Sequence, residues 1–238
     1  MTSKPTLANL KASIARQVTG FAVEKPVHNN KEYLMQPHIA KAHAEAVIER
    51  INHLCTSIAL VGEIRRGVAN VRSAAYVVEP RDPADYHARL DFLYLQGLFT
   101  RVEDNKQQPI WTETHRALTY NNTRIDLHVC DMNNRGYLLW LHTEPMSNVA
   151  YVKAMLHKRP QIVVQGDYIY HAGKLLRIPT EELFYRLIGI DYIPPTVRSK
   201  ETYERYARNR KSDPIDVTKL YAPRPTLPGT PDMFAGGA

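Results

Sequence analysis

The chain has 238 residues, of which 44% are hydrophobic and 23% charged, so most of it can fold around a packed core and widespread disorder is excluded. Its 31 Lys and Arg outnumber 24 Asp and Glu, and the charge of +7 favours an anionic partner, with nucleic acid ahead of a membrane surface. The sequence lacks the roughly 18 consecutive apolar residues of a membrane span and the apolar block of a secretory signal, so we expect a cytoplasmic protein without membrane contact.

The first part of the chain reads as a short helix and a linker over residues 1–36, followed by a longer helix from Pro37. In this longer helix the apolar residues recur at spacings of three and four, which predicts one buried face made of Ala44, Val47, Ile48, Ile51, Leu54 and Cys55. An apolar strand over 57–62, a basic turn over 63–67 and a second strand over 74–78 come next.

Asp82 is placed to cap a helix that begins at Pro83. Two strands follow, over 110–119 and 123–130, and alternation in the second places Asp126 on the face opposite its apolar neighbours. The remaining predicted elements are helices over 136–142 and 146–157, strands over 162–164 and 168–170, a helix from Thr180 to Gly189, and a basic helix over 198–211. Past Asp213 we expect a tail rich in Pro and Gly that is mobile unless a partner orders it.

The cysteines and histidines show no metal-ligand spacing. Cys55 and Cys130 are the only cysteines, which favours two reduced, buried thiols over a disulfide or a zinc site. Of the ten histidines, His142, His157 and His171 are expected at the surface.

Three separated blocks resemble the family X DNA polymerases. The strand before Gly62-Glu63-Ile64-Arg65-Arg66-Gly67 and the strand after it resemble the family's palm opening. Residues 123–127 resemble its third palm strand, and residues 180–198 resemble its thumb ending. The resemblance implies an α/β (α+β) fold, with a nucleotidyltransferase palm on a mixed sheet and a small thumb, as in the compact forms of phages and some bacteria. The predicted parts are an N-terminal helix and linker over 1–36, the palm over 37–143, the thumb over 144–200, and a basic helix and tail over 201–238.

Family X enzymes transfer a nucleotide to a 3′-hydroxyl with two divalent cations, Mg²⁺ or Mn²⁺, held by three aspartates. An ungapped comparison places Ser73 and Ala75 at the first two aspartate positions and Asp126, near Arg124, at the third. The resemblance therefore implies a degenerate, weak or inactive metal site with one remaining ligand. Asp126 has an alternative interpretation as a structural ion pair with Arg124 or Arg66.

Gly62, Glu63, Arg65, Arg66 and Thr143 occupy the positions that bind the nucleotide in the family. Glu63 replaces a small serine, which puts a like charge beside phosphate, and Glu144-Pro145 replaces the Gly-Ser that lines the sugar pocket. Arg65 and Arg66 either grip phosphate or neutralise Glu63 and the nearby sheet ends.

Nucleic-acid contacts are predicted for a set of basic residues near the end of the chain, with a solvated helix face as the alternative. The set comprises Lys153, Arg198, Lys200, Arg205, Arg208, Arg210 and Lys211. Tyr203 and Tyr206 either stack on bases or pack the basic helix onto the body, and we favour packing.

The function predicted from the sequence is a DNA polymerase beta-like protein of nucleic-acid metabolism that binds nucleic acid, DNA ahead of RNA, around a degenerate metal site. Two alternatives stay open. One is an active nucleotidyltransferase that uses Asp126 with another acid such as Glu63, and the other is a non-catalytic assembly module whose tail docks onto a protein complex. Engineered silencing of the site is a further explanation for Ser73 and Ala75.

Overall fold

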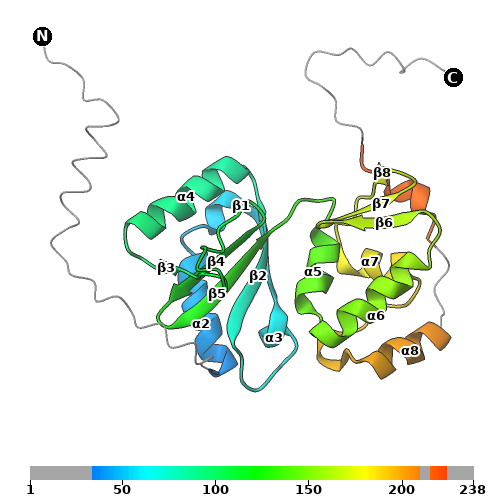
Figure 1. Cartoon of the computed structure of the whole chain (residues 1–238), viewed down its shortest axis with the longest axis horizontal. Coiled ribbons are helices and arrows are strands. Elements are labelled where there is room, and N and C mark those ends of the chain that lie inside the picture. The colour runs from blue at the N-terminus through cyan, green and yellow to red at the C-terminus, as the bar shows by residue number, and fades with distance from the viewer. Residues whose placement is uncertain (1–33, 210–214, 224–238) are drawn as a thin grey trace, which may run out of the picture. The chain divides into compact units, whose positions relative to one another are not determined.

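The computed structural model describes residues 34–209 and 215–223 (Figure 1). The described chain has a mixed α+β fold, which confirms the predicted fold class. A mixed five-stranded sheet has the order β1-β2-β5-β4-β3, and a small antiparallel sheet has the order β6-β7-β8. The strands are β1 (Cys55–Val61), β2 (Ser73–Pro80), β3 (Thr100–Arg101), β4 (His115–Tyr120), β5 (Thr123–Val129), β6 (Ile162–Gln165), β7 (Tyr168–His171) and β8 (Lys174–Leu175).

Among the described residues there are seven α-helices and three short 3₁₀ turns. The helices are α2 (Pro37–Ile48), α3 (Gly62–Arg65), α4 (Pro83–Leu95), α5 (Arg135–Thr143), α6 (Met146–His157), α7 (Glu181–Ile188) and α8 (Lys200–Arg208), and the turns are η1 (Asn52–Leu54), η2 (Pro195–Val197) and η3 (Val217–Leu220). No described helix combines the length and the apolar character that crossing a membrane requires.

Two helices start, and one of them ends, where local signals in the sequence predict. The Asp82 carboxylate accepts hydrogen bonds from the backbone N–H groups of Ala84 and Asp85 at the start of α4. The Thr180 hydroxyl accepts one from Leu183 at the start of α7. That helix ends at Gly189, whose φ of 82° is a left-handed conformation that glycine adopts without a steric penalty. These boundaries are confirmed.

Other boundaries were wrong. The first long helix ends at Ile48 instead of continuing to Cys55, because η1 follows it and Cys55 already pairs with Pro80 as the first residue of β1. Ile51 and Cys55 are nevertheless buried, so the apolar spacing continues beyond the end of the helix. The basic turn after β1 is the single helical turn α3. The strand predicted over 110–119 begins only at His115, because Trp111 forms a bridge back to Arg116.

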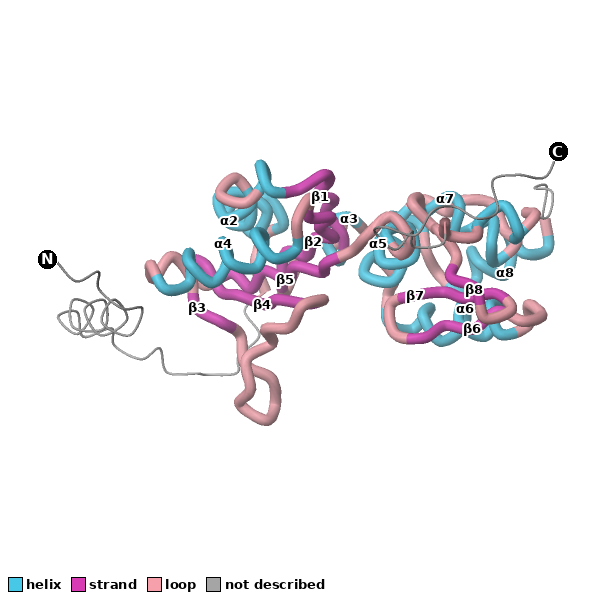
Figure 2. The backbone as a smooth tube through the Cα atoms, turned by 90° about the horizontal axis from the view of Figure 1, so that it is seen from above, coloured by secondary structure: helices cyan, strands magenta, loops and turns pink. Residues whose placement is uncertain are grey.

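The two faces of the large sheet have different cores. Helices α2 and α4 lie on the same side of the sheet (Figure 2), and they share a core with Tyr76 of β2 and Ile125 and Leu127 of β5. On the opposite face, Ala75 and Val77 of β2 belong to a second core that also contains buried residues of α5, α6 and α7. The sheet thus offers one face to its own covering helices and the other to the helices that follow β5.

The end of the described chain packs onto the body. Leu220 is buried, and Tyr221 forms a β-bridge with Leu176. The predicted mobility after Asp213 is therefore wrong for residues 215–223. The predictions for residues 1–33, for Arg210 and Lys211, and for the chain after Pro223 lie outside the described residues.

Candidate functional site

The register of the sheet brings the three positions of the implied metal site together. Strands β2 and β5 are parallel neighbours in which Ser73 pairs with Arg124 and Ala75 pairs with Asp126. Ser73 lies two residues before Ala75, so both side chains point to the same face as Asp126. That face is the one covered by α5, and Asp126 is the single acid among these three positions.

The Asp126 carboxylate is buried, with 10% of its side chain exposed, and is fully engaged. Arg124 donates from Nε to Oδ2 at 3.0 Å and from Nη2 to Oδ1 at 2.9 Å, while His115 Nε2 lies 3.0 Å from Oδ1. Burial alone would raise the pKa of Asp126, but the hydrogen bonds from His115 and Arg124 outweigh it and hold the pKa well below its usual range. This geometry supports the interpretation of Asp126 as a structural ion pair, with Arg124 as the partner.

Three histidines from three elements stack on this face and form what we call the histidine column. The ring of His128 in β5 lies 4.3 Å from that of His115 in β4 and 3.4 Å from that of His142 in α5, centroid to centroid. Burial, with the neighbouring charges, lowers the pKa of His142 to about 4 and that of His128 well below 6.5, so both rings are neutral at pH 7. His142, expected at the surface, is half-buried, because α5 packs against the sheet there.

The residues on this face do not fit a pair of divalent cations. Both oxygens of Asp126 already accept hydrogen bonds from Arg124, and neither Ser73 nor Ala75 supplies a carboxylate. The imidazoles of the column are stacked face to face instead of converging on one point. Within residues 34–209 and 215–223, no group of three or more His, Cys, Asp or Glu is arranged to hold a metal ion.

The positions that bind the nucleotide in the family also come together, but their donors are used within the protein. Arg65 donates to the Thr143 hydroxyl at 2.9 Å and pairs with Glu181 at 2.6 Å, and Arg66 donates to the Thr143 carbonyl at 2.7 Å. Of the two interpretations of these arginines, the geometry favours a structural one, in which they tie α3 to α5 and α7. Arg66 also interacts electrostatically with Glu63, as that interpretation expects.

Glu63 and Gly62 shape the turn between β1 and β2. The Glu63 carboxylate accepts a hydrogen bond from the backbone N–H of Arg72 at 2.7 Å, which closes the loop between α3 and β2. Gly62 has a φ of +71°, and a Cβ atom added there would lie 3.3 Å from the Cβ of Ala75. The positive φ and this close contact with Ala75 both favour glycine at position 62.

A buried ionic network that sequence reasoning missed holds α5, α7 and α8 together. Arg198 lies between two carboxylates, with Nη1 3.1 Å from Glu144 and Nη2 2.7 Å from Glu181, and its side chain is 0% exposed. The hydroxyl of Tyr203 donates to Glu144 at 2.6 Å. The prediction of Arg198 as a nucleic-acid contact is wrong because the side chain does not reach solvent, and Tyr203 packs α8 onto the body as favoured.

Among the described residues, the other predicted nucleic-acid contacts fall on two separate surfaces. Lys200, Arg205 and Arg208 of α8 are exposed, whereas Lys153 of α6 is half-buried. Tyr151 of α6 packs near Tyr203 of α8, with ring centroids 6.3 Å apart. Lys153 follows two residues later, about 200° around the helix, and so points away from α8. The structure therefore groups the basic residues of α8 and separates Lys153 from them.

Comparison with protein-family models and with curated proteins finds no match for this chain.

Proposed function

We propose that this chain is a nucleotidyltransferase-fold protein of nucleic-acid metabolism, similar to the palm and thumb of family X DNA polymerases, that binds nucleic acid without transferring nucleotides. One observation carries the proposal. Ala75 pairs with Asp126 in adjacent parallel strands, which is the arrangement that the resemblance requires, while Arg124 and His115 occupy the carboxylate.

The loss of catalysis follows from charge. At an effective dielectric near 20, a pair of unit charges 4 Å apart is worth about 4 kcal/mol, so two absent carboxylates facing one dication remove roughly 16 kcal/mol of gross attraction. The remaining acid is already compensated by the guanidinium of Arg124, and a metal ion would have to displace it. Nucleotidyl transfer depends on cations that bridge the attacking and leaving oxygens, and this face supplies too little negative charge to keep them.

Binding to nucleic acid is supported by the exposed cations of α8 and by the net charge of +7. Lys200, Arg205 and Arg208 project from one nine-residue helix whose buried residues, Thr202 and Tyr203, face the body. Lysine and arginine contacts to phosphate release counterions, so the affinity should fall steeply with salt. DNA is the first partner to test, with RNA second.

Fluorescence anisotropy with a labelled DNA duplex tests this surface. Replacing Lys200, Arg205 and Arg208 together by Gln should weaken binding. It should also make the negative slope of log affinity against log salt shallower, by up to about 3. The matched control replaces three exposed cations elsewhere, Arg50, Arg81 and Lys106, by Gln. The control changes the net charge equally but should keep most of the slope. Equal losses in both variants would contradict the assignment to α8, and binding that ignores salt would favour the assembly-module alternative.

Primer extension tests the absence of catalysis. We expect no incorporation of nucleotides with Mg²⁺ or Mn²⁺. Robust incorporation that depends on Asp126 would refute the proposal, and its loss in Glu63→Gln would establish the alternative in which Glu63 is the second acid. Incorporation that survives Glu63→Gln would exclude that alternative.

A further inference from the structure

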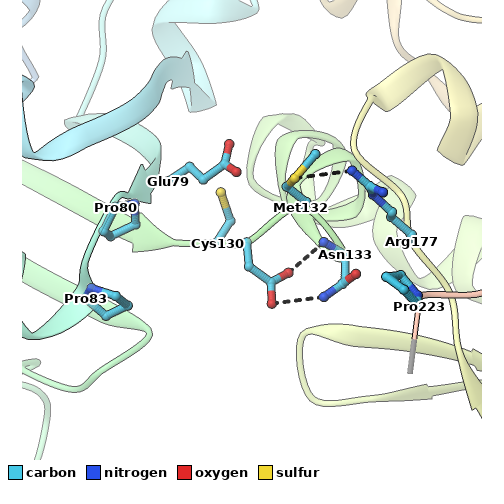
Figure 3. Close-up of a pocket in the computed structure, with 9 residues that line it drawn as sticks. Glu79, Pro80, Pro83, Cys130, Met132, Asn133, Arg177 and Pro223 are labelled. Carbon is cyan, nitrogen blue, oxygen red and sulfur yellow. Dashed lines mark hydrogen bonds between the residues drawn. The ribbon is translucent and has the colours of Figure 1, made fainter. Parts of the chain in front are cut away.

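A cavity of about 370 Å³ lies at the carboxyl ends of β2 and β5 (Figure 3). It is lined by Glu79, Pro80, Pro83, Cys130, Asp131, Met132, Asn133, Arg177 and Pro223. Because β2 and β5 are parallel, their carboxyl ends meet at one edge of the sheet, beside this cavity. Cys130 is four residues beyond Asp126, about 13 Å along the strand, so the cavity is distinct from the implied metal position at Asp126.

The acids that line the cavity are hydrogen-bonded within the protein. The Glu79 carboxylate accepts a hydrogen bond from the Ser57 hydroxyl at 3.0 Å and lies 3.8 Å from Nε of Arg135. Asp131 accepts hydrogen bonds from the backbone of Asn133 and Asn134, from the Asn133 side chain and from the Tyr168 hydroxyl. Burial raises the pKa of the Cys130 thiol to about 12, so this group adds no charge.

Arg177 is different. Its guanidinium has no carboxylate partner among the described residues, and its Nη2 donates to the thioether sulfur of Met132 at 3.3 Å. A thioether is a weak acceptor, so this contact leaves the cation largely uncompensated. The backbone of Arg177 is held firmly, because its N–H donates to the Leu220 carbonyl at 2.6 Å and its neighbours Leu176 and Ile178 are fully buried. The base of the Arg177 side chain is thus anchored at the wall of the cavity.

The rest of the wall is mostly apolar and rigid. Pro80, Pro83 and Pro223 line it together with Met132, whose side chain is still exposed. Figure 3 shows Pro80 and Pro83 on one side of the cavity and Asn133, Arg177 and Pro223 on the other. A volume of this size falls within the usual range for sites that bind small molecules.

We propose that this cavity binds a small organic anion, with its carboxylate or phosphate group held by Arg177 and its apolar body against the prolines. The anion replaces the thioether of Met132 as the partner of the guanidinium, and a bidentate contact to Arg177 is the natural geometry for either group. The site is independent of the proposed nucleic-acid surface on α8.

Titration of the full ¹⁵N-labelled chain by NMR, with benzoate, phenyl phosphate and benzamide as probes, tests this proposal. We expect saturable shifts with at least one of the two anions, at a Kd of about 1 mM or below, confined to Glu79–Pro83, Cys130–Asn133 and Leu176–Ile178. The uncharged benzamide should bind at least about tenfold more weakly. Whichever anion binds more tightly identifies the acid group, carboxylate or phosphate.

The variant Arg177→Met should lose at least about tenfold in affinity, whereas Arg186→Met, which removes an exposed cation from α7, should bind as the original chain does. Absence of saturation with both anions, equal binding of benzamide, or shifts elsewhere on the protein would overturn the proposal. The mapped shifts of the unaltered chain decide the matter if Arg177→Met does not fold.

Discussion

Replacing Arg198 by Met is expected to destabilise the protein strongly. The substitution keeps a long apolar side chain but leaves Glu144 and Glu181, whose side chains are 0% and 3% exposed, without the guanidinium that lies 3.1 and 2.7 Å from them. It also removes the Nε donor to the Ile193 carbonyl at 2.9 Å. Breaking a buried ion pair by removing one partner costs about 3–5 kcal/mol, which is a large fraction of the roughly 5–15 kcal/mol that stabilises a typical domain.

Urea denaturation followed by circular dichroism measures this loss at pH 7. The matched control is Arg205→Met, which removes an exposed cation from α8 and should change the free energy of unfolding by less than about 0.5 kcal/mol. A second variant, Arg198→Met with Glu144→Gln, should recover part of the loss because one of the two buried charges is gone. If Arg198→Met were as stable as the control but bound DNA more weakly, Arg198 would not be the centre of a stabilising buried network. The prediction that Arg198 contacts nucleic acid would then be supported.

Three further predictions concern single sites. Gly136→Ala should cost about 3 kcal/mol in thermal unfolding, since a Cβ there would overlap the Thr180 carbonyl where α5 meets the start of α7, and an unchanged melting temperature would exclude this close approach. Because burial holds the pKa of His142 at about 4, below 6.5 in the unfolded chain, the unfolded chain takes up the proton first and stability should fall as the pH drops from about 6.5 towards 4. Between pH 7.5 and 5 the free energy of unfolding should fall by about 2 kcal/mol from this group. The variant His142→Phe, which keeps an aromatic ring against His128, should lose that part of the pH dependence. An identical pH profile in the variant would show that His142 is not its source. Asp82→Ala should lower the free energy of unfolding by about 1 kcal/mol through the loss of the α4 cap, and a denaturation midpoint that does not move would contradict the capping role.

Much of the secondary structure follows from signals that act within a few residues. The cap at Asp82, the cap at Thr180 and the stop at Gly189 each depend on hydrogen bonds or backbone conformation within one helical turn. Alternation correctly placed Asp126 on the face opposite Ile125 and Leu127, which belong to the core under α2 and α4. The end of α2 was missed because Ile51 and Cys55 continue its apolar spacing after the helix has ended, and burial alone does not distinguish a helix from the turn and strand that follow.

The candidate site likewise follows in part from the sequence and in part from contacts between distant segments. The residues of the implied metal positions were named from the sequence, and the parallel register of β2 and β5 places them side by side. Their chemistry, however, depends on partners from distant parts of the chain. His115 and His142 reach the face of Asp126 from β4 and α5, and no spacing in the sequence links them.

Composition and local pattern determined that this chain folds into helices and strands around a core and carries excess positive charge. Only the tertiary structure decided which charges are free to act. Arg198 and Arg205 look alike in the sequence, yet one is buried between Glu144 and Glu181 and the other faces solvent. The physical reason is that the charges that neutralise a side chain lie within a few ångströms of it. Tertiary packing decides which charges come that close, and it joins segments that lie far apart in the sequence.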